Sequence, residues 1–399
     1  MKITLPHDVE FILDRLCAMG HTAYVVGGPV RDFYLGETPS DYDITTSATP
    51  VEIKSCFADC RTVDTGIKHG TVTLVLSGES YEITTYRIDG EYKDSRHPEQ
   101  VYFTDRIEED LARRDFTVHA MAYSPRHGLC DPFGGRADLA ERIIRTVGSA
   151  NDRFMEDALR ILRALRFASK LDFSLEEGTR VAIFSLWGRL SDVSRERIWE
   201  ELKKLFGGRS AYAVLSEYGE LIAGLLGLSK IRLPEKQAFD RLCAECRMIA
   251  VFALSAVDPA EEYFTAMKSL HTDTLTRERG RDILLALGKQ DTESDVGMLR
   301  ALSALGEEKL RMLISLETAL TGTETSAGVR LDSILSSGAA YRISDLKVNG
   351  RDMLSLGLRG PAVGDALSSL LDAVISGRVE NERTALIGFV SAGAYKNRN

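Results

Sequence analysis

Residues 27–44, GGPVRDFYLGETPSDYDI, decide the fold that the sequence predicts. The β-branched and aromatic run before them ends in two glycines, which is typical of a buried strand that leads into a turn. PVRDFYLG predicts a short helix with Pro29 in its first turn. In DYDITT, polar and apolar residues alternate from Asp41 onward, as in a strand with one face in water. The stretch therefore predicts a strand, a turn, a short helix and a second strand.

The acidic end of this stretch predicts a metal site. Asp41 and Asp43 are two residues apart on the second strand, so we expect both side chains on one face. Two carboxylates this close repel one another unless a cation lies between them, and hard oxygen ligands favour Mg²⁺. Glu82, in the strand candidate YEITTYR, is a candidate third carboxylate. We therefore expect catalytic carboxylates at these positions, with Asp41 and Asp43 as the Mg²⁺ ligands.

The other end of the stretch suits an anion. Gly28 allows close approach of the backbone, the N–H groups of the following helix start point towards an anion, and Arg31 adds a guanidinium. Carboxylates that hold a divalent cation beside an anion suit nucleotidyl transfer, in which the cation activates a hydroxyl and neutralises the leaving pyrophosphate. The alternative is an ordinary glycine turn followed by an exposed acidic strand.

The composition is that of a globular protein. At 399 residues, about two to four domains are expected. The residues are 44% hydrophobic and 27% charged, and no apolar run approaches the roughly 20 residues that span a bilayer. The first residues lack the apolar core of a signal peptide, so we expect a cytoplasmic protein with no membrane partner. The net charge of -9 argues against general coating of nucleic acid but permits a local basic groove.

The cysteines predict no metal site. CAEC, residues 243–246, has a metal-like spacing, but neither a second pair nor a nearby histidine completes a set of zinc ligands. We expect reduced, partly buried thiols.

The pattern along the chain changes near residue 150. Before it, helix and strand candidates alternate, with further strands in GTVTLVLSG (70–78) and YEITTYR (81–87). From residue 151 on, leucine and alanine recur at helical spacing and strand candidates are few. The sequence predicts a mixed α/β head followed by an all-helical remainder.

The stretch VVGGPVRDFYLGETPSDYDI resembles the signature of the class II nucleotidyltransferases, which include tRNA CCA-adding enzymes and bacterial poly(A) polymerases. The resemblance continues in order through EITTYRIDGEYKDSRHP, EEDLARRDFTVHAMAY, DPFGGRADLAERIIRTVG and RFMEDALRILRALRFASKLDF. Weaker matches follow in SRERIWEEL and LKVNGRDMLSLGLRGPAVGDAL. The resemblance implies an α+β fold: a polymerase β-like nucleotidyltransferase head with a small mixed sheet (1–148), a helical neck for base selection (149–210), and a helical body and tail that bind tRNA (211–399).

Within RRD, the resemblance implies that Arg114 grips the triphosphate and that Asp115 senses the 2′-OH of the sugar. A carboxylate suits a hydroxyl donor. The chain departs from the family at His119, where asparagine is usual, and this puts the hydrogen bonding near the ribose in question.

The helix candidate EDALRILRALRF, residues 156–167, carries a charged stripe. Charged residues recur at every third position: Asp157, Arg160, Arg163 and Arg166. Three arginines would lie on one flank of the helix with a single acid. A solvent-facing row of ion pairs would be expected to contain more acids, so this alternative explains the pattern poorly. The resemblance implies that Asp157 and Arg160 pair with the base edges of CTP and ATP, and that Glu156 orients Arg160. Arg163 and Arg166 would reach phosphates.

The resemblance implies a CCA-adding tRNA nucleotidyltransferase, which adds C, C and A to the tRNA 3′ end from CTP and ATP without a nucleic-acid template. The segment 89–98 corresponds to a loop that is shortened in relatives that add only CC, and here it looks intact. An enzyme that adds only the terminal A and a poly(A) polymerase remain alternatives. A catalytically silent RNA-binding relative fits the clustered carboxylates less well. The oligomeric state does not follow from the sequence.

Overall fold

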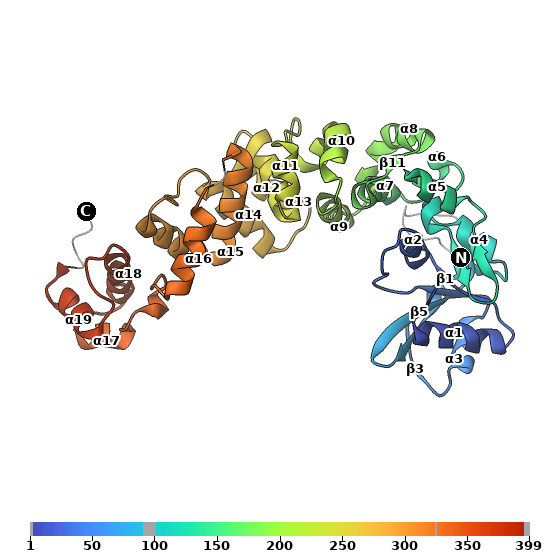
Figure 1. Ribbon diagram of the computed structural model, residues 1–399, viewed down its shortest axis with the longest axis horizontal. Coiled ribbons are helices and arrows are strands. Elements are labelled where there is room, and N and C mark those ends of the chain that lie inside the picture. Colours follow the sequence, from blue (N-terminus) through green and yellow to red (C-terminus); the bar gives the residue numbers. More distant parts are fainter. Residues whose placement is uncertain (1–2, 91–100, 324, 395–399) are drawn as a thin grey trace. The chain divides into compact units, whose positions relative to one another are not determined.

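The computed structural model describes residues 3–90, 101–323 and 325–394 (Figure 1). The chain divides into two compact units, Met1–Glu217 and Tyr218–Asn399. The first unit contains the sheet and the second unit is helical in its described residues. The predicted fold class, a mixed-sheet head followed by helices, is thereby confirmed. The finer division at residues 148 and 210 stays a prediction.

A seven-stranded sheet in the order β3-β4-β5-β2-β1-β8-β9 forms the core of the first unit. Its strands are β1 (Ala23–Val26), β2 (Ile44–Thr46), β3 (Arg61–Gly66), β4 (Thr71–Leu76), β5 (Glu79–Thr85), β8 (Ala122–Ser124) and β9 (Gly128–Cys130). All neighbours are antiparallel except β2 and β5, which run parallel with Ile44 opposite Ile83. The sheet is therefore mixed.

The turn after β1 positions the start of α2 (Gly28–Tyr34). All four residues of β1 are buried, and Gly27 leaves the strand with φ 77°, a conformation that favours glycine. A Cβ at Gly27 would lie 3.0 Å from Nη1 of Arg114, so the missing side chain also makes room for that guanidinium. The predicted strand–turn–helix is confirmed.

Helices, 3-10 turns and two small sheets complete the first unit (Figure 1). The helices are α1 (His7–Ala18), α3 (Pro50–Cys56), α4 (Ile107–Ala112), α5 (Gly135–Glu141), α6 (Ala150–Glu156), α7 (Leu159–Leu171), α8 (Glu177–Leu186) and α9 (Arg195–Phe206). The 3-10 turns are η1 (Ile67–His69), η2 (Thr117–His119) and η3 (Trp187–Asp192). Two small sheets pair β6 (Arg87–Asp89) with β7 (Val101–Phe103), and β10 (Ile143–Ile144) with β11 (Ser174–Leu175). Helix α7 packs against α9, and its leucines are buried.

The second unit consists of helices in the part of it that the structure describes. They are α11 (Lys236–Arg241), α12 (Ala244–Ser255), α13 (Pro259–Ser269), α14 (Thr274–Ala286), α15 (Asp295–Thr321), α16 (Ala327–Ser337), α17 (Gly350–Ser355), α18 (Pro361–Ile375) and α19 (Arg383–Ser391), with a 3-10 turn η4 (Ile343–Asp345). Helix α10 (Ala211–Leu226) crosses the boundary between the units. Gly306 has non-helical angles and kinks α15. Across the described residues, no helix is long and apolar enough to cross a membrane.

Candidate active site

A cavity of about 230 Å³ opens where β2 and β5 run side by side. Asp43 and Glu82 each precede a paired residue, Ile44 and Ile83, so the parallel register brings the two carboxylates alongside each other. Three guanidiniums line the same cavity, those of Arg87, Arg113 and Arg114. The cavity thus combines oxygen ligands for a cation with positive groups for an anion.

The predicted strand from Asp41 to Thr46 is partly wrong. Strand β2 begins only at Ile44, and Asp41 and Asp43 lie in the loop before it. The carbonyl of Asp43 accepts a hydrogen bond from the N–H of Val26 at 3.0 Å, so pairing with β1 starts at this residue and not earlier. Pro39, which cannot donate a ladder hydrogen bond, lies just upstream. Asp43 lines the cavity, whereas Asp41 does not and instead accepts from Oγ of Ser40 at 3.0 Å.

The acidic residues nevertheless influence one another. Partial loss of hydration raises the pKa of Asp43, and the charges of Asp41 and Glu82 raise it further against the opposing effect of Arg114. Among the described residues, no three His, Cys, Asp or Glu side chains are close enough together to hold a metal ion. The carboxylates still fit a divalent cation. Their oxygens are the hard ligands that such cations prefer, and a bound cation would relieve the repulsion between them.

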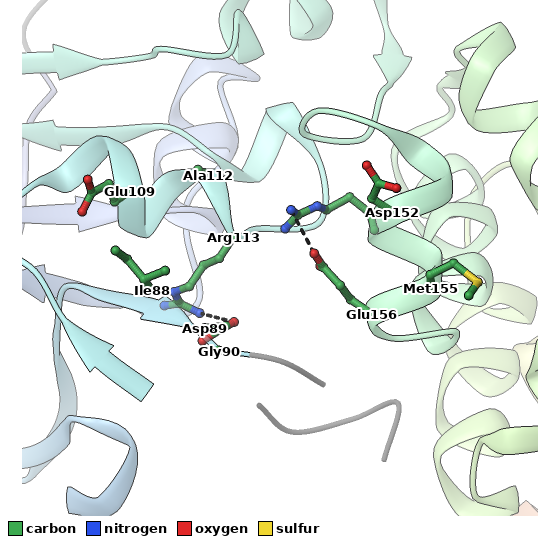
Figure 2. A pocket seen from close by; sticks show the side chains of 10 residues that line it. Ile88, Asp89, Gly90, Glu109, Ala112, Arg113, Asp152, Met155 and Glu156 are labelled. Carbon is green, nitrogen blue, oxygen red and sulfur yellow. Dashed lines mark ion pairs between the residues drawn. The ribbon is translucent and has the colours of Figure 1, made fainter. Parts of the chain in front are cut away.

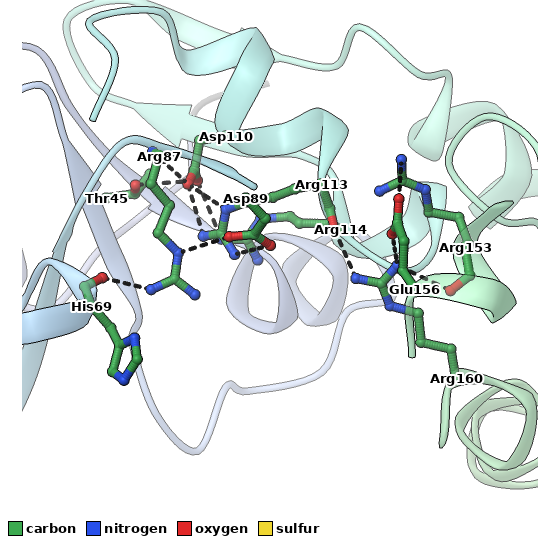
Figure 3. Close-up of polar contacts among 10 residues, drawn as sticks. All are labelled: Thr45, His69, Arg87, Asp89, Asp110, Arg113, Arg114, Arg153, Glu156 and Arg160. Carbon is green, nitrogen blue, oxygen red and sulfur yellow. Dashed lines mark hydrogen bonds and ion pairs between the residues drawn. The ribbon is translucent and has the colours of Figure 1, made fainter. Parts of the chain in front are cut away.

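Asp110 is a central residue of the site that the sequence analysis missed. It is fully buried, and its Oδ1 accepts from Nε and Nη2 of Arg113 at 3.0 and 2.8 Å (Figure 3). Its other oxygen accepts from Oγ1 of Thr45 at 3.3 Å and lies 3.7 Å from Arg114. In DLARR, Asp110 lies three and four residues before the two arginines, and on a helix this spacing indicates ion pairs between them. Asp110 anchors both arginines at the cavity.

A chain of buried polar contacts joins the turn after β1 to α7. Nη1 of Arg31 lies 2.6 Å from Nε2 of His119, and Nδ1 of His119 lies 3.3 Å from Oδ1 of Asp115. The other oxygen of Asp115 accepts from Nε and Nη2 of Arg163 at 2.8 and 2.5 Å. These contacts bring together three predicted site residues, Arg31, Asp115 and Arg163, and they include His119, where the chain departs from its family.

The contacts fix the tautomer of His119. A guanidinium only donates, so Nε2 must be the acceptor, and a carboxylate only accepts, so Nδ1 must carry the proton. Burial lowers the pKa of His119 to about 4, in keeping with a neutral ring. Burial alone would raise the pKa of Asp115, but Arg163 and His119 hold it well below its ordinary value. The neutral ring offers one donor to Asp115 and one acceptor to Arg31, two contacts that the NH₂ group and the oxygen of an asparagine amide could also make.

Each of the three arginines of α7 has an acidic partner of its own, so the single acid on their flank of the helix is not their only partner. Arg160 pairs with Glu156 at 2.6 Å, Arg163 with Asp115, and Arg166 with Glu201 of α9 at 2.6 Å. Two of these acids lie far away in the sequence, so the local pattern could not show them. The contact of Glu156 with Arg160 agrees with the predicted orienting role, although that role remains a prediction. Arg160 also donates to the carbonyl of Arg113 at 3.1 Å (Figure 3).

Asp157 does not lie on the same helix as Arg160, contrary to the prediction. Helix α6 ends at Glu156, Asp157 is extended with φ −141° and ψ 104°, and α7 begins at Leu159. Oδ1 of Asp157 accepts from the N–H of Leu159 at 3.0 Å, and its Oδ2 accepts from Nη2 of Arg197 at 2.8 Å. The carboxylate thus supports the start of α7 and ties it to α9.

A second cavity, of about 750 Å³, lies between the strand β6 and helix α6 (Figure 2). Glu156 and Arg153 line one side, and Asp89 and Arg113 line the other. Arg113 also lines the cavity at Asp43, so one guanidinium borders both spaces. Of the predicted loop at residues 89–98, residues 91–98 lie outside the described residues.

Family models match three parts of the chain. Residues 23–145 match a model described as the poly A polymerase head domain. Residues 172–221 match a model for an RNA and SrmB binding site of polymerase A, and residues 245–390 match a tRNA nucleotidyltransferase domain 2.

Two relatives and a solved structure match nearly the whole chain. The chain is 37% identical to a CCA-adding enzyme of Lactobacillus delbrueckii subsp. bulgaricus, over 95% of this chain and 96% of the relative. It is also 37% identical to a CCA-adding enzyme of Geobacillus stearothermophilus, over 95% of each chain. The crystal structure of the Bacillus stearothermophilus CCA-adding enzyme in complex with CTP matches with a TM-score of 0.84 at 32% identity, covering 99% of both chains.

Proposed function

We propose a function from the premise that this chain belongs to the family of CCA-adding enzymes, which are nucleotidyltransferases. It adds C, C and A to the 3′ end of tRNA from CTP and ATP and releases pyrophosphate, without a nucleic-acid template. The observation that carries this proposal is the pair of cavities that share Arg113. One offers carboxylates and guanidiniums for a metal-bound triphosphate, and the other offers paired charged groups for a base.

The head supplies the metal and phosphate chemistry. Nucleotidyltransferases of this family generally use a divalent metal, and the residues that would hold Mg²⁺ here are Asp41 and Asp43, with Glu82 as the third catalytic carboxylate. The bound cation would activate the 3′-hydroxyl and neutralise the departing pyrophosphate. The guanidinium of Arg114, held at the cavity by Asp110, binds the triphosphate. The N–H of Gly28 and the side chain of Arg31 lie at the turn where a further phosphate oxygen would bind.

Asp157 and Arg160, which follow Glu156 of the second cavity in the chain, select the base. A carboxylate accepts from the exocyclic amine of cytosine or adenine, whereas a guanidinium donates to a ring nitrogen or carbonyl. Glu156 fixes the guanidinium of Arg160, and Arg197 fixes the carboxylate of Asp157, so both groups are oriented before a base arrives. Uracil and guanine present a carbonyl where the amine would be, and the carboxylate disfavours them.

The contacts to sugar and phosphate come from the row of polar contacts that runs from Arg31 through His119 and Asp115 to α7. Asp115 accepts from the 2′-OH of the nucleotide, and Arg163, its ion-pair partner, would reach the phosphates. Arg166 lies over the ring of Phe167, 3.8 Å from the ring centre to Cζ, and pairs with Glu201. It is the second of the two arginines that would reach phosphates.

The helical remainder, residues 211–399, holds tRNA by its shape and its phosphates, in the cytoplasm. The experiment uses the purified chain with tRNA that ends before CC, tRNA that ends in CC, and an unrelated RNA. Addition of C, C and A to the first tRNA supports the proposal. Addition of A to the second tRNA alone indicates an enzyme restricted to A, long tails on the unrelated RNA indicate a poly(A) polymerase, and no incorporation indicates a silent relative.

A further inference from the structure

Cys243 and Cys246 lie at the start of α12, in the second unit, and play no part in the proposed nucleotidyl transfer. Cys243 immediately precedes the helix and is exposed, whereas Cys246 is buried in the first turn. The remaining cysteines are also free thiols. What distinguishes this pair is the contact between its members.

The sulfur of Cys243 is folded over the first turn of the helix. It accepts a hydrogen bond from the backbone N–H of Cys246 at 3.3 Å, and the thiol of Cys246 donates to the same sulfur. Side chains three positions apart on a helix have Cβ atoms roughly 5–6 Å apart. A disulfide needs this separation to be about 3.5–4.5 Å, and Cys243 is not held to the helical spacing, because it lies outside the helix with φ −66° and ψ 163°.

The environment shifts the pKa values of the two thiols in opposite directions. Donation by Cys246, the backbone N–H groups of the helix start and the charge of Arg247 lower the pKa of Cys243 to about 6. The adjacent sulfur and burial raise the pKa of Cys246. The other charged groups nearby are Glu245, which pairs with Arg279 of α14 at 3.0 Å, and Glu308 of α15, which lies 3.2 Å from the same arginine. An exposed thiolate therefore lies against a buried, protonated thiol.

We propose that Cys243 and Cys246 form a reversible dithiol–disulfide centre that reacts with small-molecule disulfides. The thiolate of Cys243 attacks one sulfur of the small disulfide, the S–S bond breaks, and one thiolate leaves. Cys246 then gives up its proton to a departing thiolate and attacks the sulfur of Cys243. The second thiolate leaves and takes a proton from solvent. The two cysteines are oxidised to a disulfide, and the small disulfide is reduced to two thiols.

The chain contains its own control pair. Cys56 and Cys60 also lie close in sequence at the end of a helix, one buried and one partly exposed. Burial raises the pKa of both, and Asp59, whose Oδ1 lies 3.6 Å from the sulfur of Cys60, raises that of Cys60 further. Cys60 should therefore behave as an ordinary thiol in the same preparation.

The first test measures alkylation of the full chain by iodoacetamide between pH 5 and 9, with each cysteine followed by peptide mass spectrometry. Cys243 should be half-maximally reactive near pH 6. At that pH it should react on the order of tenfold faster than Cys60, since its larger thiolate fraction outweighs its lower intrinsic nucleophilicity. Equal rates for the two cysteines at pH 6 would overturn the proposal.

The second test incubates the chain with oxidised glutathione and measures the intact mass. The wild-type chain should lose two hydrogen atoms, with the disulfide mapped to residues 243–246. Cys246→Ser should stop at a glutathione adduct on Cys243, Cys243→Ser should give neither product, and Cys60→Ser should behave as the wild type. A wild-type chain that stops at the adduct, or one that does not react, contradicts the proposal even if a serine variant fails to fold.

Discussion

Nε2 of His119 lies 2.6 Å from Nη1 of Arg31, although the two residues are 88 positions apart in the chain. The ring also contacts Asp115, so it connects an arginine at the proposed phosphate site to the residue proposed to bind the ribose. A protonated ring would face the guanidinium with a second positive charge. The arrangement is therefore stable only with a neutral imidazole.

A first prediction follows for substitutions of His119. His119→Asn keeps one donor and one acceptor, so kcat/KM for CTP and ATP should stay within a few-fold of the wild type. His119→Leu has a similar size and no polar atoms, and leaves Arg31 and Asp115 without this buried partner. Such a loss costs about 1–3 kcal/mol, which corresponds to roughly ten- to a hundredfold in kcat/KM. Equal activity of the leucine and asparagine variants would show that the ring has no positioning role.

A second prediction concerns stability at acid pH. The pKa of His119 falls from its ordinary 6.5 to about 4 in the folded state, so the unfolded chain binds the extra proton between these values. The stabilisation is present above pH 6.5 and is lost as the pH falls towards 4. Asp115, whose pKa is lowered from 3.8, contributes only below this window. Between pH 7 and 4.5 the wild type should lose about 2 kcal/mol more than His119→Asn, measured by urea unfolding. Parallel losses in both proteins would contradict this assignment.

A third prediction tests the carboxylates. Asp43→Asn and Asp41→Asn should each abolish incorporation of both C and A and leave tRNA binding largely unchanged, because the substitutions remove the proposed cation ligands from the head. Asp14→Asn, which changes an exposed residue that pairs with Arg126, is the matched control and should retain activity. The measurements are incorporation of labelled CTP and ATP across a Mg²⁺ titration, with tRNA binding followed separately. Normal incorporation by either active-site variant in saturating Mg²⁺ would falsify its role.

The sequence predicted the parts of the site that short-range rules govern. Paired glycines and Pro29 fix a turn and a helix start, and alternation in residues 41–46 indicates strand pairing, although the strand itself begins at Ile44. The helix break at Asp157 was missed because the leucine spacing continues through it. An aspartate can accept the N–H two residues ahead and so compete with helix formation, as Asp157 does with Leu159.

The partners of the charged residues could not be predicted in the same way. Glu201 binds Arg166 and Arg197 binds Asp157, and both partners come from α9, about 35 to 40 residues further along the chain. The packing of α9 on α7 places these partners beside Arg166 and beside the residues just before α7. A local sequence pattern shows that arginines line up on a face, but it does not show which acids the rest of the fold brings to them.

The last prediction separates a base-reading role of Asp157 from a purely structural one. Its Oδ1 accepts from the N–H of Leu159, and its Oδ2 accepts from Arg197. Asp157→Asn can keep the first contact through its amide oxygen, while it replaces the second oxygen with a donor and so loses the contact with Arg197. A donor there pairs with the carbonyl of uracil and no longer accepts from the amine of cytosine.

The ratio of kcat/KM for CTP to that for UTP should therefore fall in Asp157→Asn by roughly ten- to a hundredfold, equivalent to about 1–3 kcal/mol. Asp157→Ala should show a similar loss of discrimination and, because the helix start loses its acceptor, a further loss of about 1 kcal/mol in stability. Both variants should keep more turnover with CTP than Asp43→Asn, since the proposed metal ligands are intact. The measurement is kcat/KM for CTP, ATP, UTP and GTP with matched tRNA ends, together with thermal unfolding. If all four rates fall together and their ratios do not change, Asp157 supports only the junction of α6, α7 and α9, and the base is selected elsewhere.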